Sequence, residues 1–346
     1  MVGLSSMKHP GKHFLVIATT GSGIGDALMG TPALRSLRES FPESAIHLLV
    51  NSKRKELFQG NPNIDRILGY RNNWLIRSFL FWRTFFSRYD FVLVFHANED
   101  LWKILKMIRY RECHNRQGFE NSARKIFSLN PLPQHSIEKR LALVERVGGK
   151  KSSDYSYEYF LPEEAAGWRE GKLKEWGIAP GEKLLGLQMG AADRYKCWPL
   201  DSFVELARKI RAKHRVKIFL NASAKERELI KQFQTRFSEG GVFYWEGGAL
   251  WQSAALISAC SLFISNDTGP MHMAIGLGVP LVALFCPSDS LVTGPLHNSR
   301  SIVIRKEKPC NPCLYRRCPD PFCMNQISVD EVFQAADQIL RRGPTP

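Results

Sequence analysis

The sequence contains no apolar run long enough to cross a bilayer. Its first apolar stretch, residues 14–18, is far shorter than the roughly 20 residues that a membrane-spanning helix needs. The residues before it lack the apolar core of a signal peptide. Internal repeats and low-complexity tracts are also absent. We therefore expect a globular protein in the cytoplasm.

A complete dinucleotide-binding fingerprint is missing too. Residues 14–18 predict a buried strand, and a Gly-x-Gly-x-x-Gly pattern begins after it at Gly21. The pattern requires glycine at position 26, where the chain has Asp26. A carboxylate there would repel a pyrophosphate, so a dinucleotide is disfavoured. We predict instead a glycine-rich loop over residues 21–30, a helix capped by Thr31, and Asp26 as either a general base or a helix cap.

Basic residues exceed acidic ones mainly in the first half of the chain. The net charge is +15, and residues 1–150 hold 23 Lys and Arg against 12 Asp and Glu, whereas the remainder holds 25 against 21. This asymmetry favours an anionic partner, such as a phosphorylated acceptor, lipid headgroups or nucleic acid, over the alternative of a merely solvated surface. An aromatic, Arg-rich stretch at residues 74–88 predicts a helix that covers the sheet or lies in a membrane interface.

The length of 346 residues suits about two domains with separate cores. Apolar runs alternate with amphipathic helical patterns, which is typical of a doubly wound parallel sheet in an α/β protein. We expect domains of residues 1–165 and 166–346. The predicted strands cover residues 14–18, 46–50, 91–95, 184–188, 216–220, 262–264 and 281–285, and the predicted helices begin near residues 31, 74, 136, 163, 199, 221, 267 and 329.

Residues 262–289 carry the clearest ligand-binding pattern. Two apolar runs bracket a small-residue segment, which predicts a strand, a helix and the next strand. The helix should begin within residues 267–270, where a proline fits the first turn and Asp267 or Thr268 can cap the free amides. Such amides at the carboxyl end of a strand bind phosphates in α/β folds. His272 either adds a donor or is a satisfied interior residue.

Two charged side chains follow strands in the second half of the chain. Lys196 comes after the strand at residues 184–188, where an anionic ligand would bind. Glu226 opens the helix after the strand at residues 216–220. It either stabilises the helix dipole or binds ribose hydroxyls.

Four of the eight cysteines lie close together in the sequence. They form a C-x2-C-x4-C-x4-C pattern at Cys310, Cys313, Cys318 and Cys323. In a cytoplasmic chain, this grouping favours thiolate metal ligands over disulfides. The spacings are shorter than those of common zinc modules, so reduced thiols are the alternative.

Together these segments resemble glycosyltransferase family 9, the ADP-heptose heptosyltransferases of lipopolysaccharide core synthesis. Their order and spacing agree with the family over most of the chain. The matching pieces are Gly25-Asp26 with Thr31-Pro32-Ala33-Leu34, Lys196-x-Trp198-Pro199, Glu226, Asn266-Asp267-Thr268-Gly269-Pro270-Met271-His272, and Gly294 after Cys286-Pro287-Ser288-Asp289. The resemblance implies a GT-B architecture of two Rossmann-like domains, the first binding the acceptor and the second the nucleotide-sugar.

The resemblance also implies an inverting transfer of heptose from ADP-heptose to an anionic lipopolysaccharide precursor at the inner face of the inner membrane. Asp26 would remove the proton of the acceptor hydroxyl. Lys196 would stabilise the charge on the departing ADP. The sequence has no Asp-x-Asp motif, so this account requires no metal for the chemistry. Nucleic acid is not an expected partner.

The remaining donor contacts follow from the same resemblance. Asp267 would contact sugar hydroxyls and Glu226 the adenosine ribose. The start of the helix would hold the diphosphate through Thr268, Gly269, Pro270 and His272. Ala191-Ala192 stand where relatives often have polar residues, so the donor sugar is open.

The resemblance leaves other functions and an additional metal open. A protein-modifying branch of the family binds iron at four cysteines, which keeps zinc or iron at the cysteine cluster and a protein acceptor among the alternatives. A relative using another nucleotide-sugar is a further alternative. A non-catalytic sugar-nucleotide sensor is the alternative from a different class.

Overall fold

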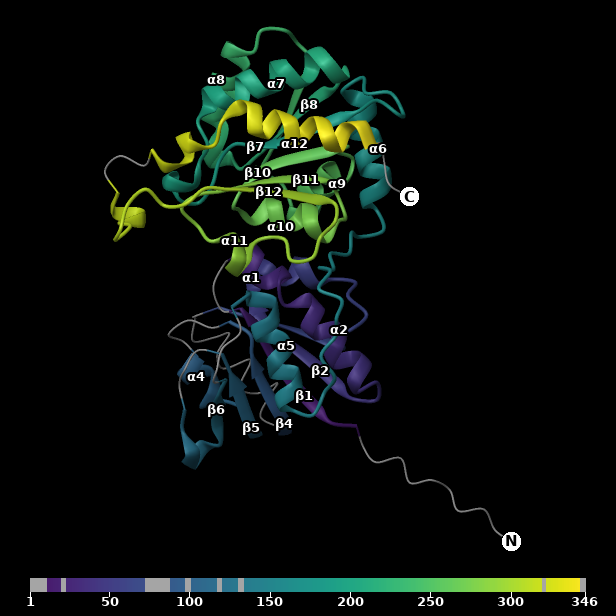
Figure 1. The fold of residues 1–346 in the computed structure, drawn as a ribbon. Coiled ribbons are helices and arrows are strands. Elements are labelled where there is room, and N and C mark those ends of the chain that lie inside the picture. Colours follow the sequence, from purple (N-terminus) through teal and green to yellow (C-terminus); the bar gives the residue numbers. More distant parts are fainter. Residues whose placement is uncertain are drawn as a thin grey trace. The chain divides into compact units, whose positions relative to one another are not determined.

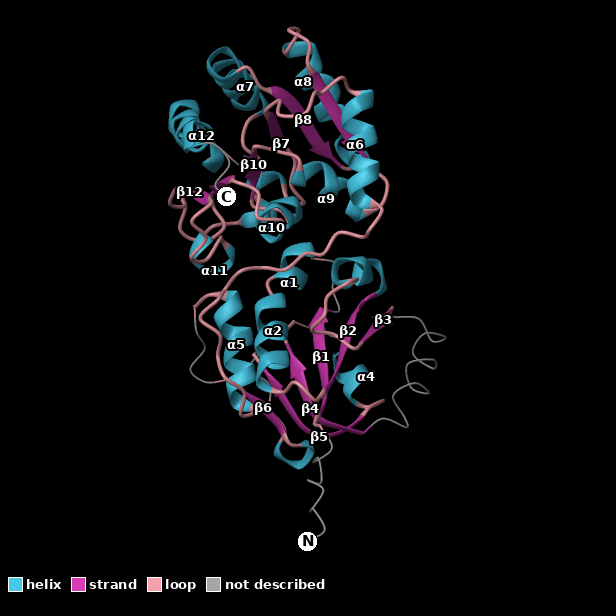
Figure 2. Ribbon diagram, turned by 90° about the vertical axis from the view of Figure 1, so that its right-hand side faces the viewer, coloured by secondary structure: helices cyan, strands magenta, loops and turns pink. Residues whose placement is uncertain are grey.

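The structure is a computed structural model that describes residues 11–19, 23–71, 88–96, 101–116, 120–129, 134–318 and 322–342. The chain divides into two compact units, Met1–Tyr155 and Ser156–Pro346. Each unit contains one six-stranded sheet (Figures 1 and 2). The expected division near residue 165 falls within the second unit, at the start of its first helix.

The sheet of the first unit is entirely parallel. Its strands are β1 (His13–Thr19), β2 (Ala45–Asn51), β3 (Arg66–Tyr70), β4 (Arg88–Val94), β5 (Arg109–Asn115) and β6 (Ile126–Ser128). They lie in the order β3-β2-β1-β4-β5-β6. Successive side chains of β1 point to opposite faces, so Leu15 and Ile17 join one core while Phe14 packs on Phe41 and Phe91 on the other side.

Helices cover both faces of the first sheet. They are α1 (Ile24–Leu28), α2 (Thr31–Ser40), α4 (Leu101–Leu105) and α5 (Ser136–Arg146), with 3-10 turns η1 (Ser52–Phe58) and η2 (Ser122–Arg124). Helices α2 and α5 pack together on one face, and α4 lies on the other (Figure 2). Ile104 and Leu105 of α4 enter the core with Leu15 and Ile17. The doubly wound fold class predicted from the sequence is therefore confirmed for this unit.

The glycine-rich loop expected over residues 21–30 is wrong in part. Residues 24–28 form helix α1, and this helix buries Ala27 and Leu28 completely. The cap of α2 is Gly30, and the Thr31 hydroxyl instead donates to the Leu28 carbonyl at 2.8 Å.

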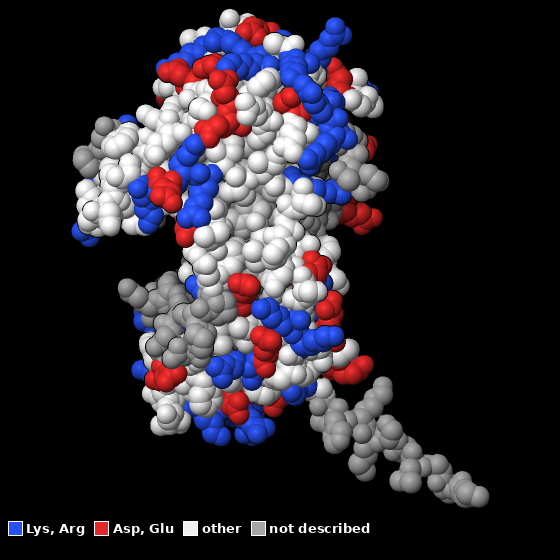
Figure 3. All heavy atoms as spheres, viewed as in Figure 1, with Lys and Arg blue, Asp and Glu red and all other residues white. Residues whose placement is uncertain are grey.

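Two exposed arginines of the first unit lie on a strand. Arg109 and Arg111 belong to β5, which pairs with strands on both sides. The predicted helix over residues 74–88 lies outside the described residues, except that Arg88 begins β4. In Figure 3, lysine and arginine side chains gather on the first unit near the starts of β4 and β5, where Arg88 and Arg109 are exposed.

The sheet of the second unit repeats the topology of the first. Its strands are β7 (Leu184–Gln188), β8 (Lys217–Ala222), β9 (Val242–Glu246), β10 (Leu262–Asn266), β11 (Leu281–Phe285) and β12 (Ser301–Arg305). The order is β12-β11-β10-β7-β8-β9, all parallel. Every residue of β7, β10 and β11 is buried, which explains their nearly continuous apolar sequences.

Helices cover both faces of the second sheet. They are α6 (Ala165–Glu175), α7 (Leu200–His214), α8 (Arg227–Arg236), α9 (Leu250–Ser258), α10 (Gly269–Gly276), α11 (Ser290–Thr293) and α12 (Val329–Arg342), with 3-10 turns η3 (Arg194–Lys196), η4 (Ala224–Glu226), η5 (Tyr315–Arg317) and η6 (Cys323–Gln326). Helices α7, α8 and α12 bury one face, and α6, α9 and α10 lie on the other (Figures 1 and 2). Within the described ranges, no helix is both long and apolar enough to cross a bilayer.

Both sheets reverse their strand order beside the first strand of the unit. In the first unit this point lies between β1 and β4, and in the second unit between β7 and β10. Doubly wound folds bind ligands at the carboxyl ends of the strands at such a point. The residues directly after these four strands are therefore the candidates for the functional site.

Candidate active site

Asp26 follows β1 at the point of reversal in the first unit. It lies in the first turn of α1, whose buried face is formed by Ala27 and Leu28. The Asp26 side chain remains 35% exposed, so the carboxylate is accessible to a substrate. Gly23 lies against this carboxylate, since a Cβ atom at that position would be 3.0 Å from Oδ2.

Three basic side chains surround Asp26. The guanidinium of Arg140, on α5, is wholly buried and donates from Nη2 to the Asp26 carbonyl at 3.0 Å and to Oδ1 at 3.4 Å. His96, after β4, has Nδ1 3.9 Å from the same Oδ1. Arg116, after β5, donates from Nη2 to His96 Nδ1 at 3.1 Å. The carboxylate therefore faces residues from three neighbouring elements.

The imidazole of His96 is held in its neutral form. Burial lowers the pKa of His96, partly opposed by Asp26 and assisted by Arg116 and Arg140. Because Arg116 can only donate, Nδ1 accepts and the ring hydrogen lies on Nε2. Arg140 is accordingly the charged partner of Asp26 in this arrangement.

An ion pair joins two loops at the point of reversal in the second unit. Lys196 ends η3 after β7, and its Nζ lies 2.6 Å from Oδ2 of Asp267, the residue after β10. The side chains are 23% and 8% exposed, respectively. Two residues that the sequence assigned to separate donor contacts are thus brought into direct contact.

The helix expected to begin within residues 267–270 is confirmed. Thr268 is the N-cap of α10 and makes no side-chain capping bond, Gly269 begins the helix, and Pro270 lies in its first turn. The Thr268 hydroxyl is buried and has no partner among the described residues, and the same holds for the hydroxyl of Ser288 after β11. Buried hydroxyls without partners beside free helix amides indicate a site for a polar ligand.

His272 occupies an interior position on α10. It is 4% exposed, and its Nδ1 lies 3.3 Å from the hydroxyl of Tyr157, whose ring stacks on the imidazole at 5.8 Å. His272 therefore has a hydrogen-bond partner, as the interpretation of it as an interior histidine predicted. Its contact with a diphosphate stays a prediction.

Glu226 lies at a helix start, as predicted, and forms a capping box with Ser223. Oε2 accepts from the amide and hydroxyl of Ser223 at 2.7 and 2.6 Å, while Oε1 accepts from Gln188 at 3.0 Å. The carboxylate also lies over Gly190, where a Cβ atom would be 1.6 Å from Oε1. Contact of Glu226 with a ribose stays a prediction.

Buried amides, which the sequence did not reveal, connect the ends of the central strands. Asn221 of β8 donates to Gln188 of β7 at 2.6 Å, and Asn266 of β10 donates to the Met189 carbonyl at 2.7 Å. The Trp198 amide donates back to Asn266 at 3.1 Å. The only sequence signal was a polar residue near the end of each apolar strand. This network fixes the loops around Lys196 and Asp267.

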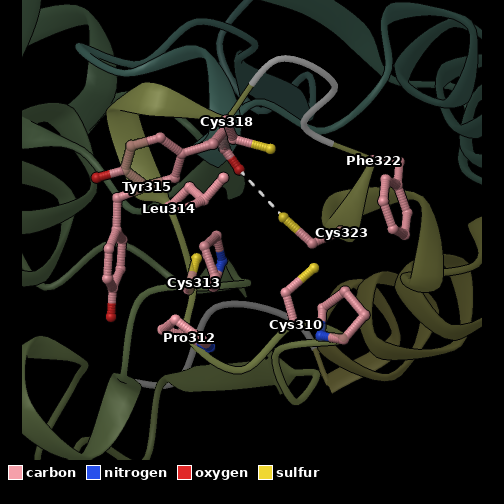
Figure 4. A pocket seen from close by; sticks show the side chains of 11 residues that line it. Cys310, Pro312, Cys313, Leu314, Tyr315, Cys318, Phe322 and Cys323 are labelled. Carbon is pink, nitrogen blue, oxygen red and sulfur yellow. Dashed lines mark hydrogen bonds between the residues drawn. The ribbon is translucent and has the colours of Figure 1, made fainter.

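The four clustered cysteines line one cavity of about 120 Å³ beside η3 (Figure 4). Tyr195, next to Lys196, forms part of the wall and packs on Tyr315 with ring centroids 5.8 Å apart. The Tyr195 carbonyl accepts from Cys323 Sγ at 3.8 Å. The cysteine segment, residues 308–318 and 322–327, therefore contacts the turn that carries Lys196.

The thiols of this cavity are not arranged as a metal-binding group. All eight cysteines are free, and the described part of the chain contains no group of three or more His, Cys, Asp or Glu side chains placed to hold a metal ion. A fifth thiol, Cys286, lies beside Cys323, and burial, followed by Cys323, raises the pKa of Cys286 to about 12. Zinc or iron at Cys310, Cys313, Cys318 and Cys323, with reduced thiols as the alternative, therefore stays a prediction.

Sequence reasoning missed the basic residues around Asp26. Arg140 carried a detectable signal, because Ile137, Leu141 and Val144 form the buried stripe of α5 and Arg140 lies on the same face. A charged residue in such a stripe indicates a buried partner. His96 carried no comparable signal, since only the fold brings the ends of β1 and β4 together.

Comparisons with known proteins identify the family of the chain. The sequence model described as glycosyltransferase family 9 (heptosyltransferase) matches residues 80–322. A protein of Campylobacter jejuni named lipooligosaccharide heptosyltransferase 2 is 25% identical over 331 residues, which cover 92% of this chain and 96% of that protein.

Two solved structures share the fold of the chain. A glycosyl transferase family 9 structure from Veillonella parvula has a TM-score of 0.84 at 23% identity, covering 98% of this chain and 100% of that one. The structure of Escherichia coli ADP-heptose lps heptosyltransferase II has a TM-score of 0.71 at 20% identity, covering 96% and 99%. The chain thus belongs to glycosyltransferase family 9 and is a transferase with the GT-B fold that its motifs predicted.

Proposed function

We propose that the protein transfers heptose from ADP-heptose to the inner core of a lipopolysaccharide precursor, either Kdo-lipid A or heptosyl-Kdo-lipid A. Family membership and the heptosyltransferase names of its relatives support this reaction. The main observation in support is that each unit has candidate reactive side chains at the point where its strand order reverses. The first unit has Asp26, and the second has the Lys196–Asp267 pair next to α10.

Asp26 acts as the general base in the proposed reaction. It accepts the proton of the acceptor hydroxyl, the hydroxyl oxygen bonds to the anomeric carbon of the heptose, and the bond from that carbon to the diphosphate oxygen breaks. ADP leaves with the bonding electrons, and the anomeric configuration inverts. A positioned base typically contributes about 10²- to 10⁴-fold to the rate.

Lys196 and the start of α10 carry the diphosphate charge. In the proposed donor complex, the ammonium of Lys196 exchanges the Asp267 carboxylate for a phosphate oxygen, and Asp267 then accepts from sugar hydroxyls. The amides at Thr268 and Gly269 add donors with the favourable end of the helix dipole. These groups supply positive potential from the protein itself, so the proposed step is written without a metal.

We place the reaction at the inner face of the inner membrane, with the protein bound peripherally from the cytoplasm. The acceptor is lipid-linked and anionic, and the first half of the chain carries most of the net positive charge. Attraction between them would concentrate the enzyme where its acceptor lies.

A relative that uses another nucleotide-sugar, or a protein acceptor, is the second candidate. Ala191-Ala192 lie in the loop between β7 and η3 and offer no polar side chain to a donor sugar. A donor with fewer contacts at that position would suit this loop equally well.

The test is to incubate the purified protein with ADP-heptose, UDP-sugars and other nucleotide-sugars, each with Kdo-lipid A or heptosyl-Kdo-lipid A. Mass spectrometry should show an acceptor heavier by one heptose residue only with ADP-heptose. Transfer from another donor, or to a protein, would replace the proposal with the second candidate. Absence of transfer from every donor would instead favour a non-catalytic sensor.

A further inference from the structure

We propose that Arg140 is the positioning residue that orients Asp26 for proton transfer. This inference rests on the proposed function. Arg140 comes from α5, more than one hundred residues away in sequence from α1, and nothing in the sequence motifs connects the two.

The Arg140 guanidinium holds the backbone and the side chain of Asp26 together. Nη2 donates to the Asp26 carbonyl at 3.0 Å and to Oδ1 at 3.4 Å, while Nη1 donates to the Ser136 carbonyl at 2.7 Å. The Ser136 contact ties the guanidinium to the start of its own helix. A planar group with several fixed donors can hold these oxygens in one geometry, which a single ammonium group cannot do.

Burial makes this arrangement rigid. Arg140 is wholly buried, so water does not compete for its donors. A buried guanidinium requires fixed partners, and Asp26 supplies two oxygens for it. Oδ1 of Asp26 is directed toward Arg140, whose Nη2 donates to it at 3.4 Å. This bond, together with the bond to the Asp26 carbonyl, favours one orientation of the carboxylate.

The other groups near Asp26 do not share this role. His96 is 3.9 Å from Oδ1, and its Nδ1 is occupied as an acceptor by Arg116. Lys139 precedes Arg140 on α5, and burial, then Arg116 and Arg140, lower its pKa. Arg140 alone of these described residues donates to both the backbone and the carboxylate of Asp26.

The test compares Arg140→Met and Arg140→Lys with the wild type in full-length protein. Methionine keeps much of the buried volume but removes every donor, so kcat for heptose transfer should fall about 10- to 100-fold because the base is misplaced. KM for ADP-heptose should not change, and the acid limb of the pH profile of kcat/KM should move to higher pH because Asp26 loses its adjacent cation. Arg140→Lys should recover part of kcat.

Arg38→Met is the matched control. Arg38 is also a paired arginine of the first unit, 2.6 Å from Asp65, but it does not contact Asp26. This variant should lose thermal stability without losing kcat. A wild-type kcat and pH profile in Arg140→Met would overturn the proposal, and so would an equal loss of kcat in Arg38→Met.

If the wild-type protein does not transfer heptose, the proposed function is refuted, but the positioning of Asp26 by Arg140 is not. A crystal structure of Arg140→Met then decides the positioning role. A rotated Asp26 carboxylate supports that role, and an unmoved one overturns it.

Discussion

Two glycines lie next to charged side chains, which limits the residues that can replace them. Gly23 lies against Asp26, and Gly190 lies against Glu226. At position 190 the carboxylate occupies the space that a Cβ atom would need, and at position 23 a Cβ atom would be 3.0 Å from the carboxylate. Gly23 and Asp26 belong to the same helical turn, but the sequence cannot show that Gly190 contacts Glu226, which follows a different strand.

Gly190→Ala should displace Glu226 and weaken donor binding. The added methyl group would overlap Oε1, breaking its bond from Gln188. Loss of a hydrogen bond to a charged group costs about 1.5 to 3 kcal/mol, so ADP affinity should fall roughly 10- to 100-fold if Glu226 contacts the ribose. Isothermal titration with ADP measures the effect.

Gly167→Ala is the control for this substitution. Gly167 is a helical glycine with open space around its Cβ position, so alanine should leave ADP affinity unchanged. Wild-type ADP affinity in Gly190→Ala would remove Glu226 from the donor site.

At the scale of elements, the sequence predicted the central strands and the helix that starts the donor site. Strands β7 and β11 were predicted because they are buried along their whole length and read as continuous apolar runs. The start of α10 was predicted because Pro270 fits only a first turn. Strand β12 was not predicted, because it is an edge strand next to β11 and none of its residues is fully buried.

Trp198 should couple the cysteine segment to the turn that carries Lys196. Its side chain is 2% exposed, packs on Phe203 and donates from Nε1 to the Ile327 carbonyl at 2.9 Å. Trp198→Phe keeps an aromatic ring but removes this donor. Amide hydrogen exchange should become faster in the cysteine segment, and ADP affinity should fall.

Trp176→Phe is the comparison for this change. Trp176 packs on Phe219 and Phe243, so its replacement should not affect exchange in the cysteine segment. Unchanged exchange there in Trp198→Phe would show that the Ile327 contact does not hold the segment.

In the molecule as a whole, both units have the same strand order, but different residues follow the corresponding strands. Each unit has its reactive side chains after its first and fourth strands, and the order of strands is the same. The sequence predicted Asp26 and Lys196 because each follows an apolar strand in a family motif. It could not predict the Lys196–Asp267 pair or that Asp26 is the partner of Arg140, because these contacts join segments that only the folded sheets bring together.

Acidification should destabilise the protein through three histidines of the first unit. Burial lowers the pKa of His47, His96 and His114 below the ordinary 6.5. Below pH 6.5 the unfolded chain therefore binds more protons than the folded chain, and the free energy of unfolding falls; above pH 6.5 these groups have little effect. The urea midpoint should be lower at about pH 5.5 than at about pH 7.5.

A substitution distinguishes the effect of these histidines on stability from the effect of other titrating groups. His114→Gln should reduce the difference between the two midpoints, whereas the exposed His297→Gln should leave it unchanged. Equal midpoints in the wild type at both pH values would contradict the assignment of neutral imidazoles to these three histidines.

The most direct test of the account is the rate of heptose transfer by Asp26→Asn, measured together with its affinity for ADP. Asparagine keeps the shape of the side chain but cannot accept the acceptor proton as a carboxylate does. We expect transfer to fall about 10²- to 10⁴-fold while ADP binds as in the wild type, since Lys196, Asp267 and α10 are intact. Transfer at the wild-type rate would contradict the account.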